Sequence, residues 1–123
     1  MKTYRPFNNN ENMFDKKSEK ELKMVENALQ DEQSKGDFKE YLRPLVEDIA
    51  DKFVNNDHAK GISRRKLIEA GWTHFDFALK KYKMRADLIL ENKKDVFFFS
   101  TYFTWYIRQG IVEYLNSLKK TRN

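Results

Sequence analysis

Residues 99–118 read FSTYFTWYIRQGIVEYLNSL, and this stretch decides the fold. Apolar side chains recur in it at the spacing that places them on one face of an α-helix. These residues are Phe103, Ile107, Ile111, Tyr114 and Leu118. The pattern predicts a helix from about Ser100 to Lys119 that docks on an apolar core.

A second set of side chains on this predicted helix lies outside the core face. Its members are Tyr102, Trp105, Tyr106 and Gln109, with Arg108 close by. Aromatic rings on a rigid helix beside cations can stack unpaired bases, and an amide can read a base edge. The alternative is that these rings pack on residues 83–99 or on the N-terminal segment, and the pattern itself leaves both open.

Two capping boxes predict the first helices. Ser18 with Glu21 indicates a helix start that Gly36 would end, and Asp37 with Glu40 indicates a second start. The apolar stripe of the second helix keeps its phase across Pro44, which predicts a kink rather than a break.

The middle of the chain predicts a loop over residues 55–61 and a third helix over residues 63–82, capped by Ser63. Residues 83–99 hold two short apolar runs, typical of a hairpin or an irregular loop. We therefore expect an all-α bundle of about four helices over residues 18–119. Residues 1–17 are predicted to be a flexible leader and residues 120–123 a basic tail.

Composition excludes several classes of protein. The 123 residues include no cysteine and two histidines, which excludes disulfide scaffolds and thiolate zinc sites. We find no phosphate-binding loop, metal-ligand spacing or nucleophile motif. We therefore expect no enzyme activity, no metal and no cofactor. No apolar run suits a membrane span or a signal sequence, so we expect a cytoplasmic protein with no membrane partner.

Charge is distributed unevenly along the chain. Residues 1–59 carry a net charge of −3, whereas residues 60–123 carry +8. The basic half also holds the aromatic-rich helix, a combination that suggests a polyanion partner, although a solvated surface gives the same composition. The candidate phosphate-binding residues are Lys80, Lys81, Lys83, Arg85 and Arg108.

Residues 99–111 resemble the region 2 signature of the sigma-70 family of bacterial RNA polymerase sigma factors. The usual pattern there is Phe-Ser-Thr-Tyr-Ala-Thr-Trp-Trp-Ile-Arg-Gln-Ala-Ile, and ten of the thirteen positions agree. Weaker similarity extends the resemblance to roughly residues 36–118. It implies a helical domain that binds the clamp helices of the polymerase largest subunit and captures non-template bases of the promoter −10 element.

The resemblance also assigns roles to individual residues. Phe99, Tyr102, Trp105 and Tyr106 match the strand-opening aromatics, and Gln109 matches the position that contacts the upstream edge of the −10 element. The polymerase-binding positions are Lys66, Ile68, Glu69 and Ala70. This chain has Lys66 and Ala70 where the family usually has carboxylates, and we expect no helix-turn-helix of the kind that reads the −35 element.

Two functional hypotheses follow. The first is a free-standing sigma-like initiation factor, monomeric when free, that holds single-stranded promoter DNA and binds core polymerase. The second is a sigma-derived regulator or protein-interaction module that has lost promoter opening. A charge reversal at Lys66 would repel a partner surface evolved for a carboxylate, which motivates the second.

Overall fold

The computed structural model is helical throughout its regular elements, as the sequence predicts. It describes residues 9–122, with the side chains of residues 17–57 and 59–119. No strand occurs within that range. The elements are α1 (Asn9–Gln30), α2 (Glu32–Val54), the short 3-10 turn η1 (Asp57–Ala59), α3 (Arg64–Gly71), α4 (Phe75–Glu91) and α5 (Phe99–Arg122).

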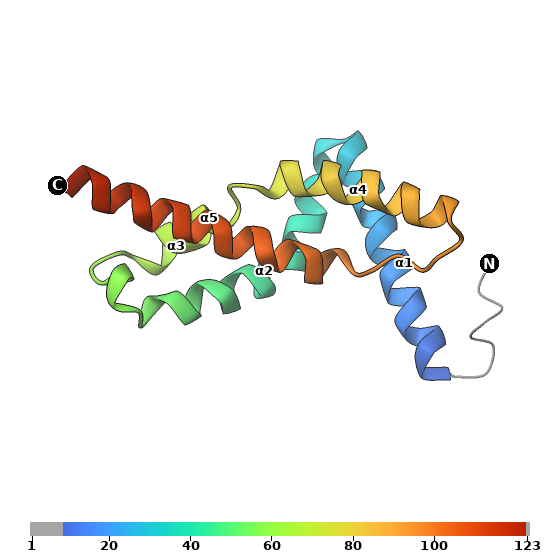
Figure 1. Cartoon of the computed structure of the whole chain (residues 1–123), viewed down its shortest axis with the longest axis horizontal. Helices are drawn as coiled ribbons and strands as arrows, with labels where there is room; N and C mark the ends of the chain where they lie inside the picture. Colours follow the sequence, from blue (N-terminus) through green and yellow to red (C-terminus); the bar gives the residue numbers. More distant parts are fainter. Residues whose placement is uncertain (1–8, 123) are drawn as a thin grey trace.

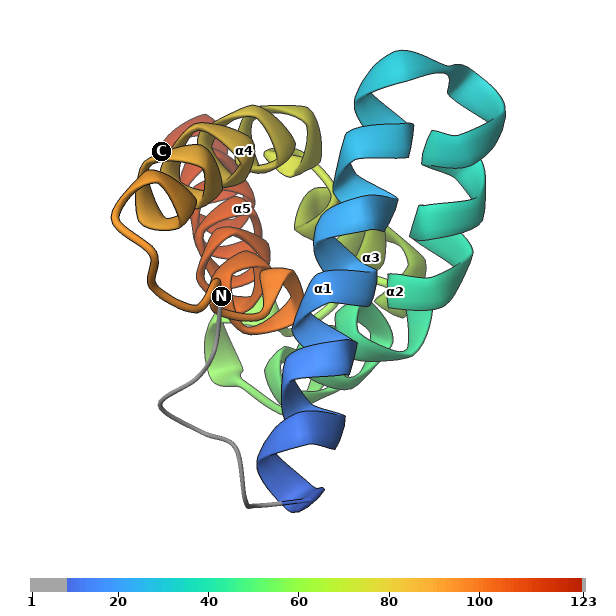
Figure 2. The same ribbon diagram turned by 90° about the vertical axis from the view of Figure 1, so that its right-hand side faces the viewer.

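The long helix α5 runs along the length of the molecule, with α4 on one side and α2 and α3 on the other (Figure 1). Helices α1 and α2 form a hairpin, which is seen most clearly in Figure 2. A single residue, Asp31, joins them. Its side chain accepts a hydrogen bond from the backbone amide of Ser34 at 2.7 Å and so caps α2. Gly36 therefore lies inside α2, and the predicted helix start at Asp37 is wrong.

The predicted start of the first helix at Ser18 is also wrong, because α1 already begins at Asn9. Residues 9–17 of the predicted leader are helical, and residues 1–8 lie outside the described residues. Ser18 and Glu21 are buried within α1. Their spacing is one helical turn, so the pattern that suggested a cap also suits one buried face.

Glu21 connects three helices. One carboxylate oxygen accepts the backbone amide of Ser100 at 2.9 Å, and the other accepts the Tyr41 hydroxyl at 3.0 Å. The first amides of a helix have no partner within the helix, so a buried helix start needs an acceptor from elsewhere. Glu21 supplies that acceptor to α5 from a helix far earlier in the chain.

Helix α2 continues through Pro44, as predicted. Its axis changes direction between the teal and the green part of the ribbon (Figure 1). Pro44 is exposed, and a proline inside a helix removes one backbone hydrogen bond and crowds the preceding turn. The bend lets one apolar face follow the core, with Phe38, Leu42, Val46 and Ile49 buried.

The predicted helix over residues 63–82 is two helices. Ser63 caps α3 as expected, accepting the Lys66 amide at 3.2 Å. Helix α3 then ends at Gly71, where the Thr73 hydroxyl donates to the Ala70 carbonyl at 2.6 Å. The Thr73 backbone amide donates to the same carbonyl at 3.2 Å, so Thr73 closes the end of α3 with two hydrogen bonds.

The hairpin considered for residues 83–99 is absent. Helix α4 continues to Glu91, with Ala86 buried one turn after Tyr82, and residues 92–98 form an irregular connection. The Tyr82 hydroxyl donates to the Phe97 carbonyl at 2.6 Å, which ties this connection to α4. The loop alternative is therefore correct for the second half of the segment only.

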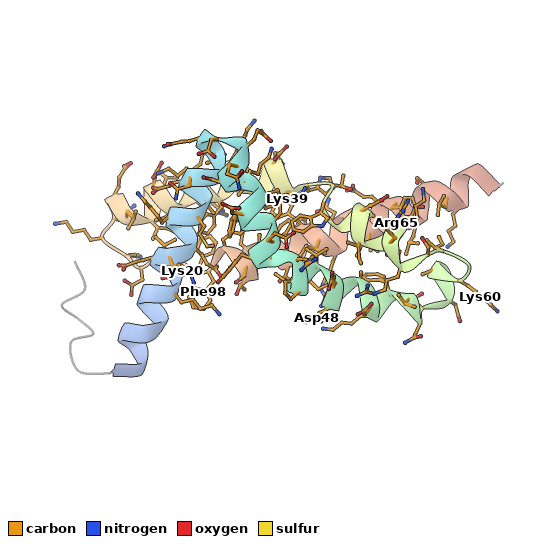
Figure 3. The ribbon with its side chains drawn as sticks, turned by 180° about the vertical axis from the view of Figure 1, so that it is seen from behind. Lys20, Lys39, Asp48, Lys60, Arg65 and Phe98 are labelled. Atoms are coloured by element: carbon orange, nitrogen blue, oxygen red, sulfur yellow. The ribbon has the colours of Figure 1, made fainter. Side chains whose placement is uncertain are left out.

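The core is built from one face of each helix, and its centre is aromatic. Phe99 and Phe103 of α5 stack at 5.4 Å between ring centroids, and Phe38 and Phe75 join them from α2 and α4. Figure 3 shows Lys39 beside this region, and its Nζ lies 5.0 Å from the ring centroid of the half-buried Trp72. Such a cation is attracted to the negative face of the ring, which its side chain shields from water while the ammonium stays solvated.

Helices α3 and α5 approach so closely that one position requires glycine. A Cβ atom added to Gly110 would lie 2.3 Å from the Ala70 carbonyl oxygen. Gly71 is also crowded, because its added Cβ would lie 3.0 Å from the Val46 side chain. The resemblance pattern has alanine at position 110, which this packing does not admit without a shift of backbone.

Substitution Gly110→Ala should therefore lower the free energy of unfolding by about 1–3 kcal/mol, the usual cost of overpacking. Gly36→Ala is the matched control, since no atom lies within 4 Å of its added Cβ and Gly36 lies inside α2. It should raise the free energy of unfolding by about 1 kcal/mol because alanine favours helix. Urea denaturation of both variants checks this, and equal effects would contradict the close contact.

A second prediction concerns pH. Burial and the hydrogen bond to Glu21 raise the pKa of Tyr41 to about 12 from its ordinary value of 10.0. The folded state therefore keeps a proton that the unfolded chain loses, so this stabilisation is complete below about pH 10 and is lost as the pH rises toward 12. Between about pH 10 and 12, the wild type should lose stability more steeply than Tyr41→Phe in urea denaturation. Parallel losses would contradict this role.

Candidate nucleic-acid interface

The second face of α5 carries a row of side chains one helical turn apart, Tyr102, Tyr106, Gln109 and Glu113. Tyr106 is at the centre of its aromatic part. Its ring centroid lies 5.2 Å from that of Tyr102 and 5.2 Å from that of Trp105, and the Tyr102 and Tyr106 hydroxyl oxygens are 3.1 Å apart. The rings thus support one another, and their positions are fixed by the helix.

Helix α4 supplies the opposite wall. A groove of about 360 Å³ lies between the two helices, lined by Lys81, Met84, Arg85, Leu88, Tyr102 and Tyr106. Phe77 extends the same wall, with its ring 5.9 Å from that of Tyr106 and with the Lys81 ammonium 5.9 Å above it. We call this feature the α4–α5 groove.

The α4–α5 groove is apolar but open to solvent. Phe77 is 54% exposed, Met84 61% and Leu88 58%. Partial burial, with the hydrogen bond to Tyr106, raises the pKa of Tyr102 to about 12, so its hydroxyl is neutral near pH 7. Exposed apolar side chains gathered along one helix face are typical of a binding surface.

Only part of the predicted phosphate-binding set lies at the α4–α5 groove. Lys81 and Arg85 are exposed and line it. Lys83 faces α1 instead, where its ammonium binds Asp87 at 2.7 Å and Glu26 at 3.0 Å. Hydrogen bonds to these two carboxylates raise the pKa of Lys83. Lys80 lines a separate depression with Lys35 and Asp76.

Phe99 is a core residue and does not lie on the surface. Its side chain is 0% exposed, and its ring lies 5.1 Å from Tyr82 and 5.2 Å from Phe38. A stacking role for Phe99 is therefore not available in this structure. The resemblance to sigma region 2 placed Phe99 with the strand-opening rings. Phe99 precedes Phe103 by four residues, about one helical turn, so it lies on the core face of α5.

Trp105 and Arg108 lie on the outer side of the row. Trp105 is 62% exposed and meets Tyr106 edge to face, and Arg108 follows about one turn later, also exposed. A planar ring of this size in water offers a stacking surface for a base, and Arg108 places a positive charge near it.

Gln109 is held by Glu113, which is itself bound by His74. Its Nε2 donates to Glu113 at 3.0 Å, and the other Glu113 oxygen lies 2.7 Å from His74 Nε2, at the N-terminal end of α4. Hydrogen bonds from His74 and Gln109 lower the pKa of Glu113, so its carboxylate is charged near pH 7. We refer to this arrangement as the His74–Glu113–Gln109 chain.

The α3 positions do not line the α4–α5 groove. Figure 3 shows Arg65 and Lys60 toward one end of the molecule and Phe98 toward the other. Lys66 and Glu69 are exposed, Ile68 is half-buried, and Ala70 is buried against α5. Ala70 thus contributes to helix packing and offers almost no surface to a partner.

Sequence analysis missed three groove residues, Phe77, Met84 and Leu88. Phe77, Lys81, Met84 and Leu88 follow a helical stripe that was present in the sequence. The predicted helix ended at residue 82, so the part of this stripe within residues 83–90 was not assigned to a helix. The spacing of Tyr82, Ala86 and Ile89 was the available signal for a continuing helix.

No protein-family model, curated protein or solved structure matches the chain significantly. Within residues 9–122, each helix is too short or too polar to span a bilayer. The described side chains contain no group of three or more histidine or acidic residues that could hold a metal ion. The surface chemistry of the α4–α5 groove is therefore the basis for a functional proposal.

Core and surface rings should differ in their effect on stability. Phe99→Ala should lower the free energy of unfolding by about 3–5 kcal/mol because it opens a cavity among packed rings. Trp105→Ala should change it by less than about 0.5 kcal/mol because that side chain is mostly in water. Thermal and urea unfolding of the two variants checks this, and a large loss in Trp105→Ala would show that this ring belongs to the core.

Proposed function

We propose that this chain is a sigma-like transcription initiation factor that holds unpaired bases of the promoter −10 element in the α4–α5 groove and binds core RNA polymerase. The observation that carries the proposal is the set of α5 rings beside Lys81 and Arg85, within the segment that resembles sigma region 2. Trp105 is exposed, and Tyr102 and Tyr106 are half-buried. Such a factor would act in the cytoplasm.

The chemistry of the α4–α5 groove supports single-stranded DNA better than duplex DNA. Rings at Tyr102, Trp105 and Tyr106 offer π-faces that a base can reach only after leaving the duplex, and each stacked base contributes about 1–3 kcal/mol. Lys81 and Arg85 lie beside the rings, at a place where they can contact the phosphates of a bound strand. The rings supply affinity, and the cations make binding depend on salt.

A second candidate is a sigma-derived regulator without promoter opening. The observation that favours it is on α3, where Lys66 is exposed and Ala70 is buried. A polymerase surface complementary to two carboxylates would face the positive charge of Lys66 and would make no contact with the buried Ala70. Binding to core polymerase, measured with and without DNA, separates the two candidates: a stable complex favours the first, and none favours the second.

The two neighbouring lysines of α4 test the DNA proposal. Lys81→Ala should weaken binding of a single-stranded oligonucleotide and reduce the slope of log affinity against log salt by about 0.7, the value for one lost phosphate contact. Lys80→Ala removes the same charge from a different side of α4 and should leave both almost unchanged. Fluorescence anisotropy of labelled DNA at several salt concentrations measures this. Equal effects would indicate binding by overall charge and would contradict a specific groove.

A further inference from the structure

The side-chain amide of Gln109 is turned away from solvent and is only half satisfied. Its Nε2 donates to Glu113 at 3.0 Å, whereas its Oε1 is buried and has no hydrogen-bond partner among the described residues. The opposite amide orientation would place two oxygens together, so the donor must face the carboxylate. A buried acceptor without a partner is unfavourable.

Glu113 is in turn held in place from α4. Its second oxygen lies 2.7 Å from His74 Nε2, so one carboxylate bridges the two helices that form the α4–α5 groove. The His74 ring also lies 6.4 Å from that of Tyr106, which places the His74–Glu113–Gln109 chain directly beside the aromatic row. Gln109 can turn outward only if its hydrogen bond to Glu113 breaks. The contact with His74 keeps Glu113 from moving with Gln109.

A glutamine can select adenine when both ends of its amide are free. The amide oxygen accepts from N6 and the amide nitrogen donates to N7, which together form a bidentate pair. In this structure Glu113 accepts one of the two N–H groups of the amide nitrogen, and the amide oxygen is buried. Gln109 can therefore form that pair only after its side chain has turned outward, a movement that the bond to Glu113 opposes.

We propose that Glu113, anchored by His74, is a positioning residue that keeps Gln109 turned inward in the free protein and so sets how strongly the site selects adenine. This inference rests on the proposed function. It assigns a role to a carboxylate at a position where a basic residue is common in the resembling family. The free protein then discriminates little between the four bases at the position nearest Gln109 unless the hydrogen bond between Gln109 and Glu113 is broken.

The test uses forked DNA with a single-stranded arm, in four versions that differ in the base pair beside the junction. Glu113→Ala removes both the charge and the hydrogen-bond acceptor, whereas Glu113→Gln removes the charge but keeps an acceptor oxygen for Gln109. Glu113 is exposed and Gln109 is half-buried. Far-UV circular dichroism verifies that each variant folds. The double variant Gln109→Ala/Glu113→Ala completes a mutant cycle.

We expect wild type and Glu113→Gln to bind the four forks with similar affinity. Glu113→Ala should prefer the adenine fork by about tenfold, the discrimination that one bidentate pair supplies, and the double variant should lose this preference. An equal gain for all four forks in Glu113→Ala and Glu113→Gln would overturn the inference, because Glu113 would then act through charge alone. If no protein binds any fork, the proposed function itself fails, and the inference with it.

A second readout examines the hold directly and needs no DNA. The side-chain amide protons of Gln109 in the free protein should shift clearly in the NMR spectrum of Glu113→Ala and much less in that of Glu113→Gln. The same shift in both variants would contradict a hold made by the hydrogen bond. This readout distinguishes an error about Glu113 from an error about DNA.

Discussion

The buried carboxylate of Glu21 holds the first turn of α5 in place, and the rest of the structure depends on that position. It accepts the Ser100 amide and the Tyr41 hydroxyl, so α1, α2 and α5 meet at one side chain. A buried charge is tolerated only where hydrogen bonds replace its water, and breaking one partner leaves the other unsatisfied. The start of α5 is therefore specified by a polar contact within an otherwise aromatic region.

Once α5 is placed, its two faces serve different purposes. Phe99, Phe103 and Ile107 fill the core, whereas Tyr102 and Tyr106 form the wall of the α4–α5 groove. Six of the 18 aromatic residues belong to α5, because this one helix supplies rings both to the interior and to the surface. The close contact at Gly110 fixes the middle of α5 on α3, so the rings of residues 102–106 lie between two anchored points of the helix.

Periodicity was sufficient to predict the helical class and most of the core face of α5, because these depend on spacing within one helix. Phe103, Ile107 and Ile111 are buried as predicted, whereas Tyr114 and Leu118 are half-buried and the buried Leu115 was not predicted. The spacing left the exposure of Trp105 open. The helix starts at Ser18 and Asp37 were wrong, since a capping pattern is identical to two polar residues one turn apart within a helix. Ser18 and Glu21 lie on a buried face of α1, whereas Asp37 and Glu40 lie on an exposed face of α2. The partner of Glu21 lies 79 residues away and could not be inferred from local sequence. For the same reason, local sequence could not show that Lys81 lies at the α4–α5 groove while Lys83 faces α1. Nor could it show that Tyr102 lies at the groove while Phe99 lies in the core. These differences depend on how α4 packs against both α1 and α5.

NMR chemical-shift mapping with a single-stranded oligonucleotide tests the central claim most directly. The account predicts that the Trp105 indole and the backbone amides of residues 77–88 and 102–109 shift in a saturable manner, while those of α1 and α2 stay unchanged. Shifts centred on α1 and α2, or spread evenly over all basic residues, would contradict the assignment of the α4–α5 groove as the site that receives unpaired bases.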